Sequence, residues 1–138
     1  MPRSGTQILK RILIADDDPT NRCWLGSLVT NEGYAAVEVN NGNEAFKILQ
    51  ADANFAAAIL NITMPGLGGI DLTGYMKTEK RLQRIPVMLI TGERDLKLLA
   101  NSFSAGALAF LHKPFTAEQL QNAFRVLTPC ATGITCGA

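Results

Sequence analysis

The sequence has few cysteines, almost no net charge and no long apolar segment, and each shortage excludes a class of protein. Its three cysteines are odd in number and lack metal-site spacing, so a disulfide framework is not expected. A reducing, cytoplasmic setting is the simplest explanation. Thirteen basic and twelve acidic residues leave a net charge of +1, which argues against a general nucleic-acid binder. No apolar run approaches the length that spans a bilayer, so neither a membrane segment nor a signal peptide is expected.

What remains is the composition of one globular domain. The chain has 138 residues, of which 47% are hydrophobic and 18% charged, enough to bury a real core. We expect residues 1–8 to form a flexible leader, residues 9–127 the domain, and residues 128–138 a tail or the start of a linker.

Short apolar runs alternate with helical patterns five times along the chain. The runs predict strands over residues 12–15, 35–39, 55–61, 87–91 and 108–111. No hairpin signal joins them, so the pattern predicts a parallel sheet with helices on both faces. We expect a flavodoxin-like α/β fold with strand order 2-1-3-4-5.

Helix start signals fall between the runs. Asp18 and Pro19 suit the cap and the first position of a helix, and Gly33 suits its end. Asn41 and Thr116 are each followed three residues later by Glu or Gln, which predicts capping boxes for the second and fifth helices. Apolar residues including Ile70 and Leu82 suggest a third helix beyond a glycine-rich loop.

Polar residues follow the buried runs at four strand ends. Asp16 and Asp17 follow the first run, Asn61 ends the third, Thr91 ends the fourth and Lys113 follows the fifth. In an open parallel sheet these ends meet where the strand order reverses, so the five side chains should share one crevice. Carboxylates suit Mg²⁺, and a lysine beside a hydroxyl suits a phosphoryl group. The sequence therefore predicts metal and phosphoryl chemistry.

Neighbouring residues have simpler explanations. Asp18 is expected to be only a helix cap. Cys23 is expected to be an ordinary helix residue, and Cys130 and Cys136 to be tail thiols. His112 is expected to lie in a strand near the surface and not to be a ligand.

With these motifs in place, the sequence resembles a response-regulator receiver domain of two-component signalling. The resemblance covers roughly residues 9–127 and rests on four segments. These are Ile12-Leu13-Ile14-Ala15-Asp16-Asp17-Asp18, Leu60-Asn61-Ile62-Thr63-Met64-Pro65-Gly66, Ile90-Thr91-Gly92, and Phe110-Leu111-His112-Lys113-Pro114-Phe115.

The resemblance implies a metal and phosphoryl site. Asp16 and Asp17 match the acid pair that holds Mg²⁺, and the backbone carbonyl of Thr63 matches another ligand of the metal. Lys113 matches the lysine that contacts the phosphoryl oxygens. The peptide bond before Pro114 is often cis in such domains.

The resemblance also implies switch and tuning positions. Thr91 matches the switch hydroxyl that follows the phosphoryl group, and Phe110 matches the aromatic rotamer switch. Thr63 and Glu93 match the positions that tune dephosphorylation. Phe110 lacks a tyrosine hydroxyl, so a switch there would depend on packing.

Asn61 departs from the family pattern, because it stands where the phosphoacceptor aspartate is expected. An amide is a poor nucleophile and cannot form an acyl phosphate. With Asp16, Asp17 and Lys113 the site has a formal charge of −1 in place of −2, so Mg²⁺ should bind more weakly. Asn61 is either an introduced substitution that blocks an ordinary receiver or a native residue of a pseudo-receiver. The Asn61→Asp form would be expected to catalyse its own Mg²⁺-dependent phosphorylation and dephosphorylation.

The resemblance implies protein partners and not a substrate. A sensor histidine kinase or phosphotransfer protein would dock near residues 19–32. An output domain or partner protein would contact the face built from the fourth helix, fifth strand and fifth helix, roughly residues 94–127, and a second copy of the chain is a further candidate. Apolar residues of the fourth helix, such as Leu96, Leu98 and Phe103, are expected to be core residues.

An enzyme is the alternative from another class. Asp16-Asp17-Asp18-Pro19-Thr20 fits the Asp-x-Asp-x-Thr nucleophile motif of haloacid-dehalogenase-like phosphatases, with Asp16 and Asp18 as the acids. Only Glu118 follows Lys113, so the acidic pair that would complete that metal site is missing. A flavodoxin-like FMN carrier is rejected, because three aspartates after the first strand would repel a phosphate.

Overall fold

Five parallel strands form one sheet in the order β2-β1-β3-β4-β5, as the sequence predicts. The structure is a computed structural model that describes residues 9–128, so the predicted leader, the tail beyond residue 128, Cys130 and Cys136 lie outside the described residues. The strands are β1 (Arg11–Ala15), β2 (Ala35–Val39), β3 (Ala57–Asn61), β4 (Val87–Thr91) and β5 (Ala109–His112). The helices are α1 (Pro19–Asn31), α2 (Gly42–Ala51), α3 (Gly69–Thr78), α4 (Leu96–Ala105) and α5 (Ala117–Leu127).

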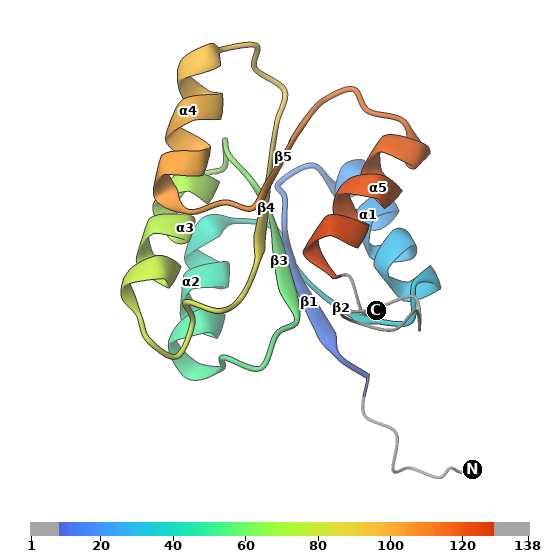
Figure 1. Cartoon of the computed structure of the whole chain (residues 1–138). Coiled ribbons are helices and arrows are strands. Elements are labelled where there is room, and N and C mark those ends of the chain that lie inside the picture. Colours follow the sequence, from blue (N-terminus) through green and yellow to red (C-terminus); the bar gives the residue numbers. More distant parts are fainter. Residues whose placement is uncertain (1–8, 129–138) are drawn as a thin grey trace, which may run out of the picture.

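Helices cover both faces of the sheet. Figure 1 shows α2, α3 and α4 on one face and α1 and α5 on the other. Every residue of β3 and β4 is buried, and their alternating side chains enter two separate cores. Leu60 and Leu89 enter the core beneath α2 and α3, whereas Ile59 and Ile90 enter the core beneath α1 and α5. Packing on both faces therefore holds the central strands in place, and with them the residues at their carboxyl ends.

The helix starts largely follow the sequence signals. Asp18 caps α1 by accepting the backbone N–H of Thr20, and Thr116 forms a complete capping box with Gln119 at α5. The box predicted at α2 is only half formed. Asn41 accepts the N–H of Glu44, but the Glu44 carboxylate lies 3.5 Å from Lys47 Nζ instead of returning to the cap.

Several element boundaries differ from the prediction, among them the start of β3 at Ala57 in place of residue 55. The third helix begins at Gly69 and ends at Thr78, so Leu82 is buried in the turn that follows it. Glycine suits the first position of this helix, because a Cβ there would lie only 2.7 Å from the Asn61 carbonyl oxygen and the backbone would have to shift. The fifth strand begins at Ala109, one residue later than predicted, and the Leu108 side chain is exposed.

The fourth helix corrects a further prediction. Leu96 and Phe103 are predicted to be core residues, but they are 83% and 49% exposed. Leu98, predicted together with them, does pack against the core beneath α2 and α3. The cause lies in the sheet order, since β5, against which α4 packs, is an edge strand and offers little sheet to cover. None of the helices within residues 9–128 is long and apolar enough to cross a membrane.

Candidate functional site

The predicted side chains meet at the carboxyl ends of β1, β3 and β4. Strands β1 and β3 are neighbours, with Ala15 paired to Leu60, so the next residues, Asp16 and Asn61, lie side by side. Asp16 and Asn61 are buried, whereas Asp17 is exposed beside them. The sheet register therefore brings Asp16 and Asn61 together, as the sequence predicts.

The Asn61 amide nitrogen lies among oxygen atoms. Nδ2 donates to Asp16 Oδ1 at 3.3 Å, to Asp17 Oδ1 at 3.2 Å and to the Thr63 carbonyl oxygen at 3.1 Å. An amide nitrogen has two hydrogens, so three acceptors share two donors. These acceptors are the same three groups that the sequence resemblance implies as metal ligands.

The Asp16 carboxylate is buried but well compensated. Its Oδ1 accepts the backbone N–H of Asp18 at 2.9 Å, and its Oδ2 accepts the side-chain amide of Asn21. Lys113 Nζ lies 3.6 Å from the same Oδ2, which supplies the opposite charge that a buried carboxylate requires. Lys113 is thus joined to the site through Asp16.

Sequence reasoning missed Asn21 and Arg22. Arg22 donates to the Asp16 carbonyl oxygen at 2.7 Å and lies 3.8 Å from the Glu38 carboxylate on β2. Both residues sit in the first turns of α1, where side chains point back toward the start of the helix and so toward the end of β1. That direction is the signal that could have identified them.

Thr91 and Glu93 join the loops that follow β3 and β4. Thr91 is buried, and its Oγ1 accepts the backbone N–H of Glu93 at 3.0 Å. Thr63 Oγ1 donates to Glu93 Oε1 at 3.1 Å. The two side chains expected to tune dephosphorylation therefore contact each other.

The end of β5 carries the remaining predicted residues. Phe110 is half-buried, with its ring 6.5 Å from that of Phe103, and the Lys113–Pro114 peptide bond is cis. His112 lies in the strand as predicted, but its Nε2 is buried and has no hydrogen-bond partner within residues 9–128, so it is less superficial than expected. Phe115 stacks on Trp24 of α1, with ring centroids 5.1 Å apart.

The donor set at this edge fits a hard cation in part. Over residues 9–128 no group of three or more His, Cys, Asp or Glu side chains is placed to hold a metal. Two carboxylates, one backbone carbonyl and one amide oxygen would have to serve, which is a set that Mg²⁺ accepts when waters complete it. Asn61 presents its nitrogen and not its oxygen to these groups, so its amide must turn for the set to be complete.

Comparisons with known proteins agree with this geometry. Residues 12–125 match the family model described as the response regulator receiver domain. The chain is 32% identical over 112 residues to chemotaxis protein CheY of Pseudomonas aeruginosa, covering 80% of this chain and 90% of that protein. It is 31% identical over 123 residues to transcriptional regulatory protein TctD of Salmonella typhimurium, covering 89% of this chain.

Some relatives are much longer than this chain. It spans 54% of TctD and 18% of the CAI-1 autoinducer sensor kinase/phosphatase CqsS of Vibrio cholerae, with 31% identity over 88% of its own length. The chain therefore corresponds to one part of those proteins.

Solved structures show the same fold. Chemotaxis response regulator CheY4 of Vibrio cholerae superposes with a TM-score of 0.78 at 22% identity, over 87% of this chain and 99% of that one. The receiver domain of sensor histidine kinase PA1611 from Pseudomonas aeruginosa, which has a magnesium ion coordinated in its active-site cleft, gives 0.75 at 23% identity, over 86% and 96%. The phosphatase alternative gains no support from these matches, and the Asp18 side chain it requires is used as the α1 cap.

Proposed function

The chain belongs to the response regulator receiver domain family of two-component signalling, and from this premise we propose that it is a receiver whose phosphoryl-accepting position is blocked by Asn61. The proposal concerns what this chain does with the site it retains. It acts through protein contacts and performs no catalytic turnover of its own.

One observation carries the proposal. The Asn61 nitrogen donates to Asp16, Asp17 and the Thr63 carbonyl at 3.1–3.3 Å. The lone pair of an amide nitrogen is delocalised and its hydrogens are engaged here, so the nitrogen does not attack phosphorus, and a neutral amide cannot form the acyl phosphate that a carboxylate forms. The hydrogen bonds also satisfy the oxygens that would otherwise require a cation.

Mg²⁺ is the expected cofactor of this site, held weakly. Asp16, Asp17, the Thr63 carbonyl and the Asn61 amide oxygen would hold it, and bound Mg²⁺ would supply positive charge for phosphoryl oxygens. The formal charge of −1 in place of −2 weakens the attraction, and the Asn61 amide must release its hydrogen bonds first.

The other predicted residues retain their roles in this proposal. Lys113 would contact phosphoryl oxygens, and Thr91 would donate its hydroxyl to them. Phe110 would follow Thr91 as a packing switch. Thr63 and Glu93 would control access of water to the site, and the hydrogen bond between their side chains supports a joint role.

Partner contacts are the proposed output. The face of α4, β5 and α5 exposes Leu96, Phe103, Leu108 and Val126, which suits a partner protein, an output domain or a second copy of the chain. A sensor histidine kinase or phosphotransfer protein would dock beside α1. We place the domain over residues 9–127, acting in the cytoplasm without direct membrane or nucleic-acid contact.

Intact-mass measurement tests the proposal. The chain and its Asn61→Asp variant are incubated with Mg²⁺ and a small phosphodonor, and an Asn61→Asp, Asp16→Asn double variant serves as control. We expect one phosphoryl group on the Asn61→Asp variant alone, which indicates a disabled ordinary receiver. If neither the chain nor the Asn61→Asp variant takes up a phosphoryl group, the chain is a degenerate binding module. Uptake of a phosphoryl group by the unmodified chain refutes the block at Asn61.

A further inference from the structure

Arg22 of α1 joins the start of that helix to two neighbouring strands. Its guanidinium donates to the Asp16 carbonyl oxygen at 2.7 Å and lies 3.8 Å from the Glu38 carboxylate on β2. The backbone N–H of Asp16 donates to the Val39 carbonyl oxygen at 3.2 Å. Asp16 is therefore held at both of its backbone polar groups, once by β2 directly and once by β2 through Arg22.

Gly26 makes room for this arrangement. It is buried in the interior of α1, where glycine is less favourable for a helix than alanine. A Cβ at this position would lie 3.1 Å from Glu38 Cδ and closer still to Oε2. The Glu38 carboxylate therefore lies directly against α1, one turn after Arg22. The space that this glycine leaves is the space that the Glu38 carboxylate uses.

The peptide group that Arg22 holds is the one between Asp16 and Asp17. Its carbonyl belongs to Asp16 and its N–H to Asp17, so holding this group fixes the two residues relative to each other. The Asp16 carboxylate is also restrained through both of its oxygens. The exposed Asp17 side chain makes one hydrogen bond within residues 9–128, from Asn61 Nδ2 at 3.2 Å. The position of Asp17 therefore depends mainly on its backbone.

We propose that Arg22, held by Glu38, is a positioning residue that keeps Asp17 in place to bind Mg²⁺. The inference rests on the proposed function, because it concerns the same metal site. Groups that orient metal ligands commonly determine metal affinity, although they do not touch the metal. Charge alone predicts the opposite effect, since loss of a nearby cation would tighten Mg²⁺ binding about threefold. Positioning and charge therefore give effects of opposite sign.

Amide chemical shifts of the ¹⁵N-labelled chain without metal test the contact itself. The Asp17 N–H belongs to the peptide group that accepts from Arg22, so its signal should move when that hydrogen bond changes. Glu38→Gln and Gly26→Ala should each shift the Asp17 signal, although both residues are distant from it in sequence. Gly26→Ala removes no charge and should not destabilise the fold, because only the flexible end of Glu38 has to move. An unchanged Asp17 signal in both variants overturns the proposal.

Mg²⁺ titration in the Asn61→Asp background tests the consequence. Arg22→Met should weaken Mg²⁺ binding about tenfold, and Gly26→Ala about threefold. Arg22→Lys should recover part of the loss, because an ammonium keeps the charge but cannot serve both partners as a guanidinium does. Weaker Mg²⁺ binding by Gly26→Ala without loss of stability would exclude a merely structural cause. Unchanged or tighter Mg²⁺ binding by Arg22→Met overturns the proposal.

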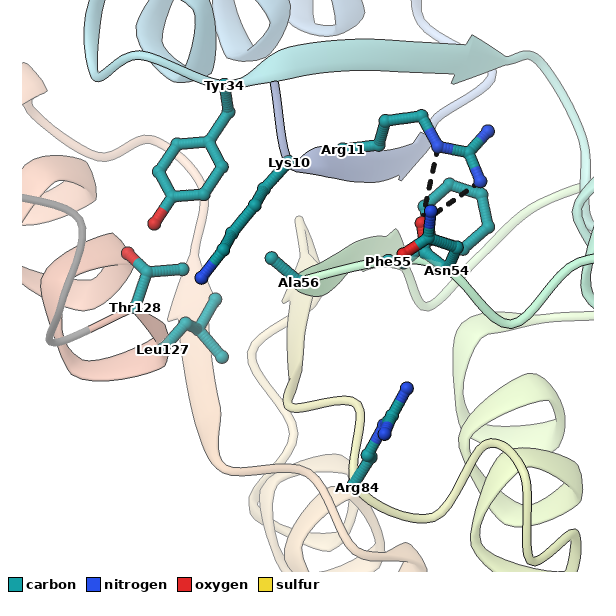
Figure 2. A pocket seen from close by; sticks show the side chains of 9 residues that line it. All are labelled: Lys10, Arg11, Tyr34, Asn54, Phe55, Ala56, Arg84, Leu127 and Thr128. Carbon is teal, nitrogen blue, oxygen red and sulfur yellow. Dashed lines mark hydrogen bonds between the residues drawn. The ribbon is translucent and has the colours of Figure 1, made fainter. Parts of the chain in front are cut away.

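Arg11 provides a matched control at the opposite edge of the sheet. Its guanidinium also pairs with a carboxylate, that of Asp52, and donates to a backbone carbonyl, that of Asn54, as Figure 2 shows for the second contact. Arg11→Met should lower the free energy of unfolding but leave Mg²⁺ affinity and the Asp17 signal unchanged. Equal weakening of Mg²⁺ binding by Arg11→Met and Arg22→Met overturns the proposal.

The two parts of the experiment separate this inference from the proposed function. If the Asn61→Asp variant binds no Mg²⁺, the proposed metal site fails. The metal-free Asp17 signal then still confirms or overturns the positioning of Asp17 by Arg22.

Discussion

Replacing Asn61 by aspartate should convert a site whose oxygen atoms accept hydrogen bonds from the Asn61 amide into one whose oxygen atoms require a cation. In the present chain the Asn61 amide donates to two carboxylates and a carbonyl at 3.1–3.3 Å. Asn61→Asp removes these donors and places a third carboxylate at the same short range. The variant should be less stable without a metal and should bind Mg²⁺ more tightly.

The size of both effects follows from the geometry. Removing the amide donors and adding like charge should lower the free energy of unfolding by about 1–3 kcal/mol in the absence of Mg²⁺. One added negative charge about 4 Å from a divalent ion contributes about 2 kcal/mol even at water-like screening. That contribution alone is about 30-fold in Mg²⁺ affinity.

Urea unfolding followed by circular dichroism, with and without Mg²⁺, measures both quantities. At a Mg²⁺ concentration 100 times its dissociation constant, the variant should recover about 2.7 kcal/mol. The unmodified chain should change far less over the same range. Asn101→Asp adds the same charge at an exposed position of α4 and should show neither effect. If Mg²⁺ raised the free energy of unfolding equally for the chain and the Asn61→Asp variant, the interpretation that the Asn61 amide takes the place of the cation would be refuted.

Two further predictions concern how the site is supported, and a third concerns an ion pair at the opposite edge of the sheet. Gly69→Ala should lower the free energy of unfolding by about 1–3 kcal/mol, because its Cβ would lie 2.7 Å from the Asn61 carbonyl oxygen, whereas Gly74→Ala, with open space around it, should stabilise α3 slightly in the same urea assay. Lys113→Met should cost about 1–2 kcal/mol, since Asp16 then keeps its buried charge without a cation, and an unchanged unfolding midpoint would contradict this. The Arg11 hydrogen bond holds the pKa of Asp52 below its ordinary value of 3.8, so the stability gained from this pair is present above that pH and is lost as the pH falls further. Asp52→Asn should therefore be less stable near neutral pH by a few tenths of a kcal/mol, with the difference shrinking in acid, as pH-dependent thermal unfolding would reveal.

The sequence predicted the parallel sheet and the meeting of Asp16 with Asn61 because the strands have strong local signals and the expected strand order 2-1-3-4-5 is the observed one. The apolar runs at β1, β3 and β4 are fully buried, and each ends in a polar residue that the parallel arrangement brings to one edge. The Asn61 position was identified in the same way. These features need only the chain direction of each strand and their order.

Features that depend on tertiary packing were not predictable in this way. The exposure of Leu96 and Phe103 depends on how little of the sheet lies beneath α4, which a helical pattern does not report. The contacts of Asn21 and Arg22 with Asp16 join the start of α1 to the end of β1, and a helical pattern alone does not report them. The pocket at the amino ends of β1, β3 and β4, shown in Figure 2, is built from segments that are distant in sequence, so no local motif marks it.

The stack of Trp24 on Phe115 gives this domain an optical reporter. Trp24 is the only tryptophan in the chain, and its indole lies 5.1 Å from the Phe115 ring, two residues beyond Lys113. Because Lys113 is held by Asp16, a movement of Lys113 toward a bound anion would shift the ring that covers one face of the indole. Changes in tryptophan fluorescence should therefore report events at the carboxyl edge of the sheet without any attached label.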